Sequence, residues 1–564
     1  MHFQKLNLVA EKSNVGMNCE TRKPQFSFFT KRAVTSLAIA SGLLLSACAQ
    51  DEEVPLGQIG YVQGFYGAIS GDEPTSVLVG RDVLTAGGTA ADAAIAMSFT
   101  MAATYPGRAG LGAGGVCLMH DGAIGLTETL DFTGGEGSLK TGDRAAAIPG
   151  MVRGMAVMHA RYGTMDWRQL VLPAEQYARY GHRFSRAARA DVTLAEGPLM
   201  KDANVKEIFV NEEGWIHSEG YRFDQVDLAA TLAQIRAKGA GAFYQGPFAR
   251  QVAEGIQAAG GNVSEEDLRN YLPEWRGVYG VQAGNYTFYT PEAPAGGGAV
   301  MAEALALANA DERYEDLSGV DRLHLLLEAS KRAYAHQQEY VKAGWEIAIP
   351  VDQLSGSEHA EQVMSGFDIS KVSTNRLANV KFSENSYNTG FVVVDRSGNA
   401  AICDISLNNL FGTGRMAEGL GFMIAASPDK KTRNPLNLAP MAVISTGANS
   451  FHGAIAGAGG SVKKLSAMNV MLDVAVNEKN LIDALVEPRM GLSPDLGTVL
   501  VEDSFDPEVI SRLKEKGYRI DRAELSSRLN AVYCKNGLPR EDVGAGCLTF
   551  TDPRGHGLSL MTSE

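Results

Sequence analysis

The sequence has a deficit of basic residues and no local cluster of metal-binding side chains. Its 564 residues include 51 Lys and Arg against 65 Asp and Glu, which gives a formal net charge of −14. Because phosphate binding requires a concentrated basic surface, this balance disfavours nucleic acid as a partner. The ten histidines form no H-x-x-x-H cluster, and no pair of the six cysteines has the spacing of zinc ligands. The sequence therefore predicts no metal site.

The N-terminal hydrophobic run is short. It extends from Ala33 to Leu45 after a Lys-Arg pair, too short for a stable transmembrane helix but as long as the apolar part of a signal peptide. It ends in LSAC, which resembles a bacterial lipobox with Cys48 as the lipidated residue. This resemblance implies a signal peptide at residues 1–47 and an exported lipoprotein anchored at the periplasmic face of a membrane. An ordinary cleavage site with an incidental cysteine is the alternative.

The cysteines beyond the N-terminus form two pairs of different character. Cys534 and Cys547 flank a polar connection that contains Asn536-Gly537, so a hairpin can bring them within disulfide range in an oxidising periplasm. Cys117 and Cys403 each lie inside an apolar, strand-like run. We expect these two to be small core residues rather than reactive thiols.

A predicted β-hairpin is the central feature of the C-terminal half. The β-branched run Val392–Val394 is followed by the turn cluster Asp395–Asn399 and by a second apolar run, Ala400–Leu407. Thr389 stands at the head of the first strand. On this spacing alone, Thr389 is an ordinary residue at the end of a strand.

A glycine-rich segment at residues 110–115, GLGAGG, matches the dinucleotide-binding pattern literally. That pattern must follow a strand and open a helix, whereas this segment follows a predicted helix and opens a predicted strand. The sequence therefore predicts no cofactor. Helices and strands alternate along the chain without a regular βαβ rhythm, which favours a layered α/β or α+β fold over a Rossmann sheet or TIM barrel.

Nine short motifs in one order resemble the γ-glutamyltransferase (glutathione hydrolase) family of N-terminal-nucleophile hydrolases. They are Gly87-Gly88 with Asp92-Ala93-Ala94, 110–115, 130–132, 149–154, 161–164, 242–246, Asp395–Asn399 with 411–414, Gly459-Gly460-Ser461, and 552–555. The resemblance implies a four-layer αββα sandwich and a small peptide or amide substrate, glutathione-like compounds included. It also implies a precursor that cuts itself into a large subunit, residues 48–388, and a small subunit, residues 389–564, which form one intertwined domain.

The resemblance assigns chemistry to five positions. A threonine freed by cleavage uses its own α-amine as the base for its hydroxyl. The amides of Gly459 and Gly460 would form the oxyanion hole. Ser406 matches an auxiliary hydroxyl position, and Asn408 matches a substrate-binding asparagine.

The sequence departs from the family at the nucleophile. Counted back from Asp395, the family's nucleophilic threonine falls at Asn388, and Thr389 is the next residue. Asparagine cannot act as this nucleophile, so Thr389 is the candidate nucleophile and the Asn388–Thr389 bond the candidate cleavage site. A slip of one residue reverses the faces of a strand and requires a bulge, for which Gly390 is suited.

The substrate-binding positions also differ. Thr133 replaces the arginine that binds the substrate carboxylate, Lys430 with Asp429 beside it replaces an aspartate, and Asn437 begins the pair that replaces two serines. Threonine cannot reproduce a bidentate arginine contact.

Two functions remain open. One is an autoprocessed amidohydrolase with altered specificity, and the other is a catalytically degenerate lipoprotein that keeps the fold for binding or as a scaffold. Arg108, Arg153 and Arg415 are alternative sources of positive charge, although each is more simply explained as a surface or supporting residue.

Overall fold

The computed structural model describes residues 65–294, 297–340, 351–373, 387–428, 437–538 and 546–562, all within the compact unit Gln63–Glu564. The predictions for the signal peptide, for Cys48 and for Asp429 lie outside the described residues. Among the described helices, none is both long and apolar enough to cross a membrane.

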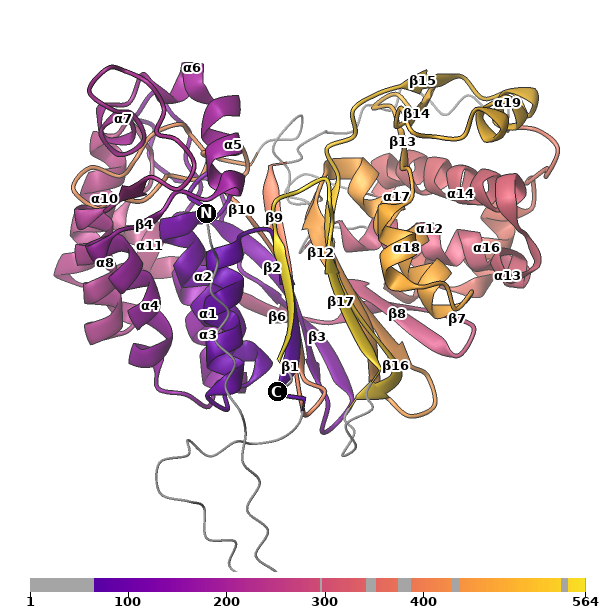
Figure 1. The fold of residues 1–564 in the computed structure, drawn as a ribbon, viewed down its shortest axis with the longest axis horizontal. Helices are drawn as coiled ribbons and strands as arrows, with labels where there is room; N and C mark the ends of the chain where they lie inside the picture. Colours follow the sequence, from indigo (N-terminus) through magenta and orange to yellow (C-terminus); the bar gives the residue numbers. More distant parts are fainter. Residues whose placement is uncertain are drawn as a thin grey trace, which may run out of the picture. The chain divides into compact units, whose positions relative to one another are not determined.

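Two β-sheets form the centre of this unit, and helices cover the outer face of each (Figure 1). The seven-stranded sheet has the order β18 (Leu558–Thr562), β1 (Gly67–Gly71), β9 (Asn388–Asp395), β10 (Ala400–Ser406), β2 (Gly114–Asp121), β3 (Leu126–Asp131), β6 (Glu274–Arg276). The six-stranded sheet has the order β17 (Cys547–Thr551), β16 (Arg528–Leu538), β12 (Phe451–Ala458), β11 (Met441–Ser445), β8 (Tyr286–Pro291), β7 (Val278–Ala283). This is the expected αββα sandwich.

The helices fall into two groups by the sheet they cover (Figure 1). The group associated with the seven-stranded sheet comprises α1 (Pro74–Thr85), α2 (Ala90–Thr104), α3 (Met151–Tyr162), α4 (Trp167–Tyr180), α5 (Arg186–Leu194), α6 (Glu196–Leu199), α7 (Ala203–Phe209), α8 (Val226–Lys238), α9 (Gly241–Tyr244), α10 (Pro247–Ala258) and α11 (Glu265–Asn270), with the short ribbon β4 (His182–Arg183) and β5 (Arg222–Phe223). The other group comprises α12 (Gly298–Asn309), η1 (Ala310–Glu312), α13 (Arg313–Asp316), α14 (Gly319–Tyr340), α15 (Val351–Leu354), α16 (Ser357–Met364), α17 (Gly460–Ala475), α18 (Leu481–Val486) and α19 (Pro507–Glu515), with the small sheet β13 (Met490–Leu492), β14 (Val499–Val501) and β15 (Ile520–Arg522).

Strand β9 is buried on both faces. Phe391 and Val393 pack in the core beneath the first helical group, whereas Val392 and Val394 pack between the two sheets. Because side chains alternate along a strand, a continuous apolar run is what a central strand between two cores requires.

The β9–β10 hairpin forms as predicted, with Asp395 accepting hydrogen bonds from the backbone of its turn. Its register is continuous from Asn388 opposite Ser406 to Val394 opposite Ala400, so the predicted bulge at Gly390 is wrong. Gly390 instead lies where the two sheets approach each other, and a Cβ atom there would clash with the backbone of Gly457. The glycine serves a close approach of two backbones within a regular strand.

The structure contains two disulfides. One joins Cys534 to Cys547 across β16 and β17. The other joins Cys117 to Cys403, which lie opposite each other on β2 and β10. Both of these cysteines are fully buried, which confirms the prediction that they are core residues, but their disulfide was not predicted. Cys117 and Cys403 are 286 residues apart in the sequence, and only the pairing of β2 with β10 brings them together.

Candidate active site

The ends of four neighbouring chain segments bring several predicted residues to one edge of the seven-stranded sheet. Asn388 lies opposite Ser406, and Ser406 lies opposite Gly114 on the next strand. A Cβ atom on Gly114 would lie 3.0 Å from the Cα atom of Thr133, which follows β3. The nucleophile region and the predicted substrate positions on this sheet are therefore adjacent.

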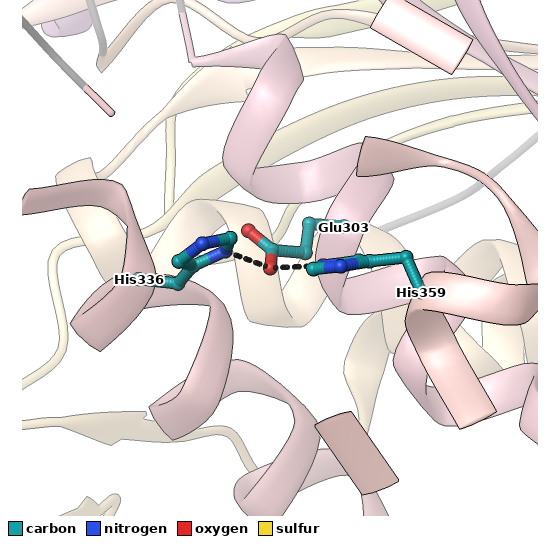
Figure 2. Close-up of side chains that lie close together, drawn as sticks. All are labelled: Glu303, His336 and His359. Carbon is teal, nitrogen blue, oxygen red and sulfur yellow. Dashed lines mark hydrogen bonds and ion pairs between the residues drawn. The ribbon is translucent and has the colours of Figure 1, made fainter. Parts of the chain in front are cut away.

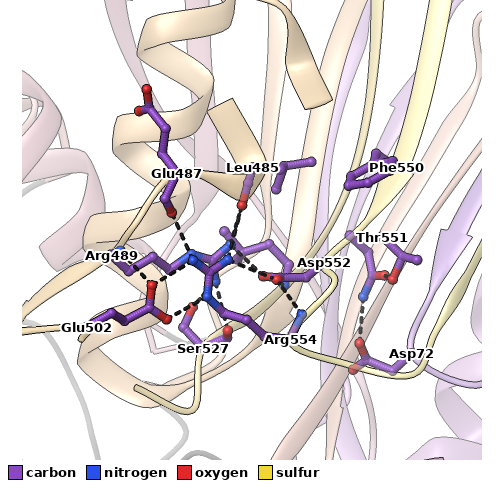
Figure 3. A network of polar contacts seen from close by, with 12 residues as sticks. Asp72, Leu485, Glu487, Arg489, Glu502, Ser527, Phe550, Thr551, Asp552 and Arg554 are labelled. Carbon is purple, nitrogen blue, oxygen red and sulfur yellow. Dashed lines mark hydrogen bonds and ion pairs between the residues drawn. The ribbon is translucent and has the colours of Figure 1, made fainter. Parts of the chain in front are cut away.

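Thr389 is fully buried, and its hydroxyl is held by a carboxylate. Its Oγ1 donates a hydrogen bond to Asp72 Oδ2 over 2.9 Å, and the Gly390 amide donates to the same oxygen over 3.3 Å. Asp72 Oδ1 accepts from Asn530 of the other sheet over 2.8 Å, and Figure 3 shows Asp72 close to Thr551, which also bonds Asn530. A carboxylate at this distance can accept the hydroxyl proton.

The carbonyl that precedes Thr389 is held by a buried cation. Arg108 Nη1 donates to the Asn388 carbonyl oxygen over 3.1 Å. The same guanidinium binds both oxygens of Asp191, over 2.6 and 2.7 Å. Burial by itself lowers the pKa of Arg108, but the Asp191 carboxylate outweighs this effect and raises the pKa. Arg108 is therefore a fixed positive charge against the Asn388–Thr389 peptide bond.

The side chains of Asn388 and Thr389 face opposite sides of β9. The Asn388 amide nitrogen donates to the Gly457 carbonyl over 2.6 Å, so it points toward the six-stranded sheet. Its amide oxygen is buried and has no hydrogen-bond partner in the described part of the chain. Alternation places Thr389 on the face of Phe391 and Val393. With no bulge, Thr389 does not occupy the position of Asn388.

The predicted glycine pair forms the N-terminus of helix α17. Gly459 precedes the helix with φ of 131°, and Gly460 is its first residue with φ of 58°. A side chain on Gly459 would clash with Ser527, which Arg489 fixes through hydrogen bonds to its carbonyl and hydroxyl oxygens over 2.8 and 2.9 Å (Figure 3). The free amides of a helix N-terminus suit a developing negative charge.

A buried ion pair joins helix α17, which begins at this glycine pair, to the β9–β10 hairpin. Lys463, in the first turn of α17, binds Asp404 of β10, and both side chains are at most 1% exposed. Asp404 also accepts from the amides of Ala439 and Gly457 over 2.8 and 3.1 Å. Burial raises the pKa of Asp404 and lowers that of Lys463, and their mutual attraction opposes both shifts.

Three of the remaining predicted residues form hydrogen bonds within the protein, and the fourth is buried. Ser406 Oγ accepts from the Asn408 amide over 2.9 Å, and the Asn408 side chain donates to Ala426 O over 2.9 Å. The hydroxyl of Thr133 donates to Asp131 over 2.7 Å. Asn437 is buried, and its amide nitrogen has no partner among the residues that the structure describes.

An open cleft of about 960 Å³ adjoins the start of β9. Tyr387, which directly precedes Asn388, lines it together with Arg108, Arg528, His556 and Arg554. Arg554 is bound to both oxygens of Glu502 and to Asp552 (Figure 3).

Arg528 differs from the other two arginines of this cleft. No carboxylate of the described residues pairs with it, although Arg108 and Arg554 both have such partners. Neither Asp72 nor Arg528 could be identified from sequence patterns. Asp72 lies 317 residues from Thr389, and only the fold brings these two residues together.

An αββα sandwich with a hairpin whose first strand lies at the centre of one sheet defines the class of N-terminal-nucleophile hydrolases. Within that class, the sequence matches the family model of gamma-glutamyltranspeptidase over residues 76–561, so the chain belongs to this family.

The relatives of this chain are divergent. The glutathione hydrolase proenzyme of Escherichia coli K12 is 27% identical over 557 residues, covering 89% of this chain and 95% of the relative. That of Pseudomonas aeruginosa is 30% identical over 408 residues, covering 68% and 72%. Among solved structures, the cephalosporin acylase from Bacillus halodurans superposes with a TM-score of 0.74 at 22% identity, covering 88% of this chain and 96% of that one. This structural similarity supports the fold.

Proposed function

We propose that the chain is a precursor that cleaves itself between Asn388 and Thr389 and then acts as an amidohydrolase with Thr389 as its nucleophile. One arrangement carries this proposal: Asp72 accepts a hydrogen bond from the Thr389 hydroxyl, while Arg108 donates one to the Asn388 carbonyl. A base on the nucleophile and a positive charge on the adjacent carbonyl oxygen are what an acyl shift needs.

The cleavage would proceed through an ester. Asp72 takes the hydroxyl proton as Thr389 Oγ1 attacks the Asn388 carbonyl carbon, and Arg108 stabilises the oxyanion. When the intermediate collapses, the C–N bond breaks, the Thr389 nitrogen takes up the proton, and an ester joins Asn388 to Thr389 Oγ1. Water hydrolyses this ester, which leaves a carboxylate on Asn388 and a free hydroxyl and α-amine on Thr389.

The α-amine released by cleavage then serves as the base for substrate chemistry. Thr389 Oγ1 attacks the amide carbon of a substrate, the amides of Gly459 and Gly460 hold the oxyanion, and the leaving amine departs with a proton. Water or an acceptor amine releases the acyl group. The substrate is a small peptide or amide, and the glutathione hydrolases among the relatives make glutathione-like compounds the first to test.

The substrate carboxylate would contact Arg528, because Thr133 supplies no charge and the other cleft arginines are paired. We expect Arg528→Ala to raise KM at least tenfold for an acidic substrate and to leave KM nearly unchanged for its methyl ester. Equal effects on both substrates would contradict this contact. The exposed Arg186, which pairs with Glu219, provides a control variant, Arg186→Ala.

Self-cleavage can be tested on purified chain by a reducing denaturing gel and N-terminal sequencing. The expected fragments end at Asn388 and begin at Thr389. Thr389→Ser should still cleave, Thr389→Ala should not, and Asp72→Asn should slow cleavage by about 10²- to 10⁴-fold, the usual contribution of a general base. Asp82→Asn, at an exposed carboxylate, is the matched control. A wild-type chain that stays uncut contradicts the proposal.

A second function is favoured by the regular register of β9. Asn388 occupies the family's nucleophile position, and Thr389 faces the other side of the strand. A non-catalytic member that binds small ligands or partners through the cleft would show these features. An uncut chain without amide turnover, but with saturable binding of a small peptide that Arg528→Ala abolishes, would support this function.

We also propose that the protein is exported and lipidated at Cys48, a proposal supported by the LSAC sequence that follows the short apolar run. Labelled palmitate should enter the wild-type chain in cells and should not enter a Cys48→Ala variant. Equal labelling of both would contradict lipidation at this residue.

A further inference from the structure

A cluster of two imidazoles and a carboxylate lies in the second helical group, on helices that carry none of the candidate active-site residues (Figure 2). Glu303 Oε1 is 2.6 Å from His336 Nδ1 and 3.0 Å from His359 Nε2. We propose that Glu303, His336 and His359 bind a divalent transition metal, with Zn²⁺ as the expected ion.

Glu303 lies in buried, apolar surroundings, so its negative charge needs a partner. It lies in α12, where every residue from Gly298 to Ala308 is buried and the other side chains are apolar or absent. Its own side chain is 0% exposed. A carboxylate in such a place is costly unless it is paired with charge or coordinates a metal.

Two other helices direct ligand atoms to this carboxylate. His336 comes from α14 and His359 from α16, and Figure 2 shows both rings turned toward Glu303. The rings lie face to face with centroids 5.3 Å apart. Tyr340, one turn after His336, donates to Glu303 Oε2 over 3.4 Å.

Two of the three separations between ligand atoms are close to those that zinc requires. All three lie within 4.8 Å of one another. Zinc bonds of about 2.0–2.1 Å in a tetrahedron place ligand atoms roughly 3.3 Å apart. The two oxygen–nitrogen distances of 2.6 and 3.0 Å therefore need to widen by less than about 1 Å.

Three features favour a metal over a hydrogen-bonded core cluster. Two imidazoles and one carboxylate form a donor set that suits Zn²⁺ and related ions. The imidazoles are 24% and 15% exposed while Glu303 is buried, so the site opens on one side, where water can complete the coordination. Tyr340 on Oε2 provides the outer hydrogen bond typical of metal-bound carboxylates.

The metal would fix α14 and α16 onto the buried helix α12. This role is independent of self-cleavage and amide hydrolysis. No sequence pattern indicates the site, because His336 and His359 lie 33 and 56 residues from Glu303 and no short spacing links the three residues.

The test uses the full mature chain, purified without a polyhistidine tag, stripped with a chelator and titrated with ZnCl₂. We expect one equivalent of Zn²⁺ per chain, a rise in Tm that chelation reverses, and visible absorption when Co²⁺ replaces Zn²⁺. His359→Gln retains an N–H donor to Glu303 but should lose the bound equivalent and the Tm rise. His217→Ala, at a histidine of the other helical group, should retain both.

Failure of the wild type to bind one equivalent at micromolar free Zn²⁺ would overturn the proposal. Equal Zn²⁺ binding by His359→Gln would overturn it as well. If His359→Gln does not fold, Glu303→Gln is the second variant, because it keeps an acceptor for both imidazoles and removes the charge. The Co²⁺ spectrum of the wild type tests the site without any substitution.

Discussion

Replacing Lys463 by methionine should destabilise the protein strongly. The substitution keeps an unbranched side chain but leaves the fully buried Asp404 without its cation. Breaking one side of a buried ion pair typically costs about 3–5 kcal/mol. The amides of Ala439 and Gly457 still donate to Asp404, so we expect the low end, about 3 kcal/mol.

The double variant Asp404→Asn with Lys463→Met separates lost charge from lost packing. This double variant buries no charge. The side-chain oxygen of the new asparagine can accept from only one of the two backbone amides, and leaving the other amide without an acceptor costs about 1–3 kcal/mol. We therefore expect the double variant to be more stable than Lys463→Met alone. Urea-unfolding midpoints at pH 7, compared at equal m-values, measure the relative stability of the two variants.

The pH dependence of the free energy of unfolding provides a second test of the buried ion pair. In Lys463→Met, burial raises the pKa of Asp404 without an opposing cation. When the pKa of a carboxyl group is higher in the folded than in the unfolded protein, the protonated group favours the folded state. This stabilisation is complete at a pH below the pKa of the unfolded protein, and it is lost as the pH rises through the pKa of the folded protein. The deficit of Lys463→Met should therefore shrink as pH falls from 7 toward 4. A deficit below about 1 kcal/mol that does not change with pH would refute the charged-pair reasoning.

Three further predictions concern other parts of the molecule. Gly459→Ala should lose more stability than Gly87→Ala in urea unfolding, because both positions have positive φ but only Gly459 would clash with a neighbour. Burial lowers the pKa of His120 to about 4, so stability should fall between pH 6.5 and 4, by up to about 3 kcal/mol, and His120→Phe should flatten that slope in the same assay. The Cys117–Cys403 disulfide would join the two proposed subunits, so a cleaved chain should run as one band without reductant and as two bands with it, whereas Cys117→Ser should give two bands in both.

The features that sequence predicted well are local. The hairpin of β9 and β10 follows from three consecutive β-branched residues and the turn that begins at Asp395, whose side chain caps that turn. The Cys534–Cys547 disulfide follows from a polar turn between two strands. The αββα architecture followed from the order of motifs that resemble the family, because no local pattern specifies how two sheets pack.

The features that sequence missed depend on distant pairing. Asp72 reaches Thr389 only because β1 lies beside β9 in the sheet. The sequence predicts a bulge at Gly390, but the approach of Gly457 from the other sheet explains the glycine. Hydrophobic periodicity indicates which face of a strand is buried, but it does not indicate which backbone lies against it.

The regular register of β9 imposes an order on the proposed chemistry. In the uncut chain, the peptide bond to Asn388 holds Thr389 in the strand, paired with Ile405 and facing away from Gly457. Cleavage would free the Thr389 nitrogen from that peptide, so the hydroxyl could turn from Asp72 toward the glycine pair. Amide turnover should therefore appear in step with the fragment that begins at Thr389, measured in one time course by gel and by product release. Turnover that precedes the fragment would show that the uncut strand is already competent and that this order is wrong.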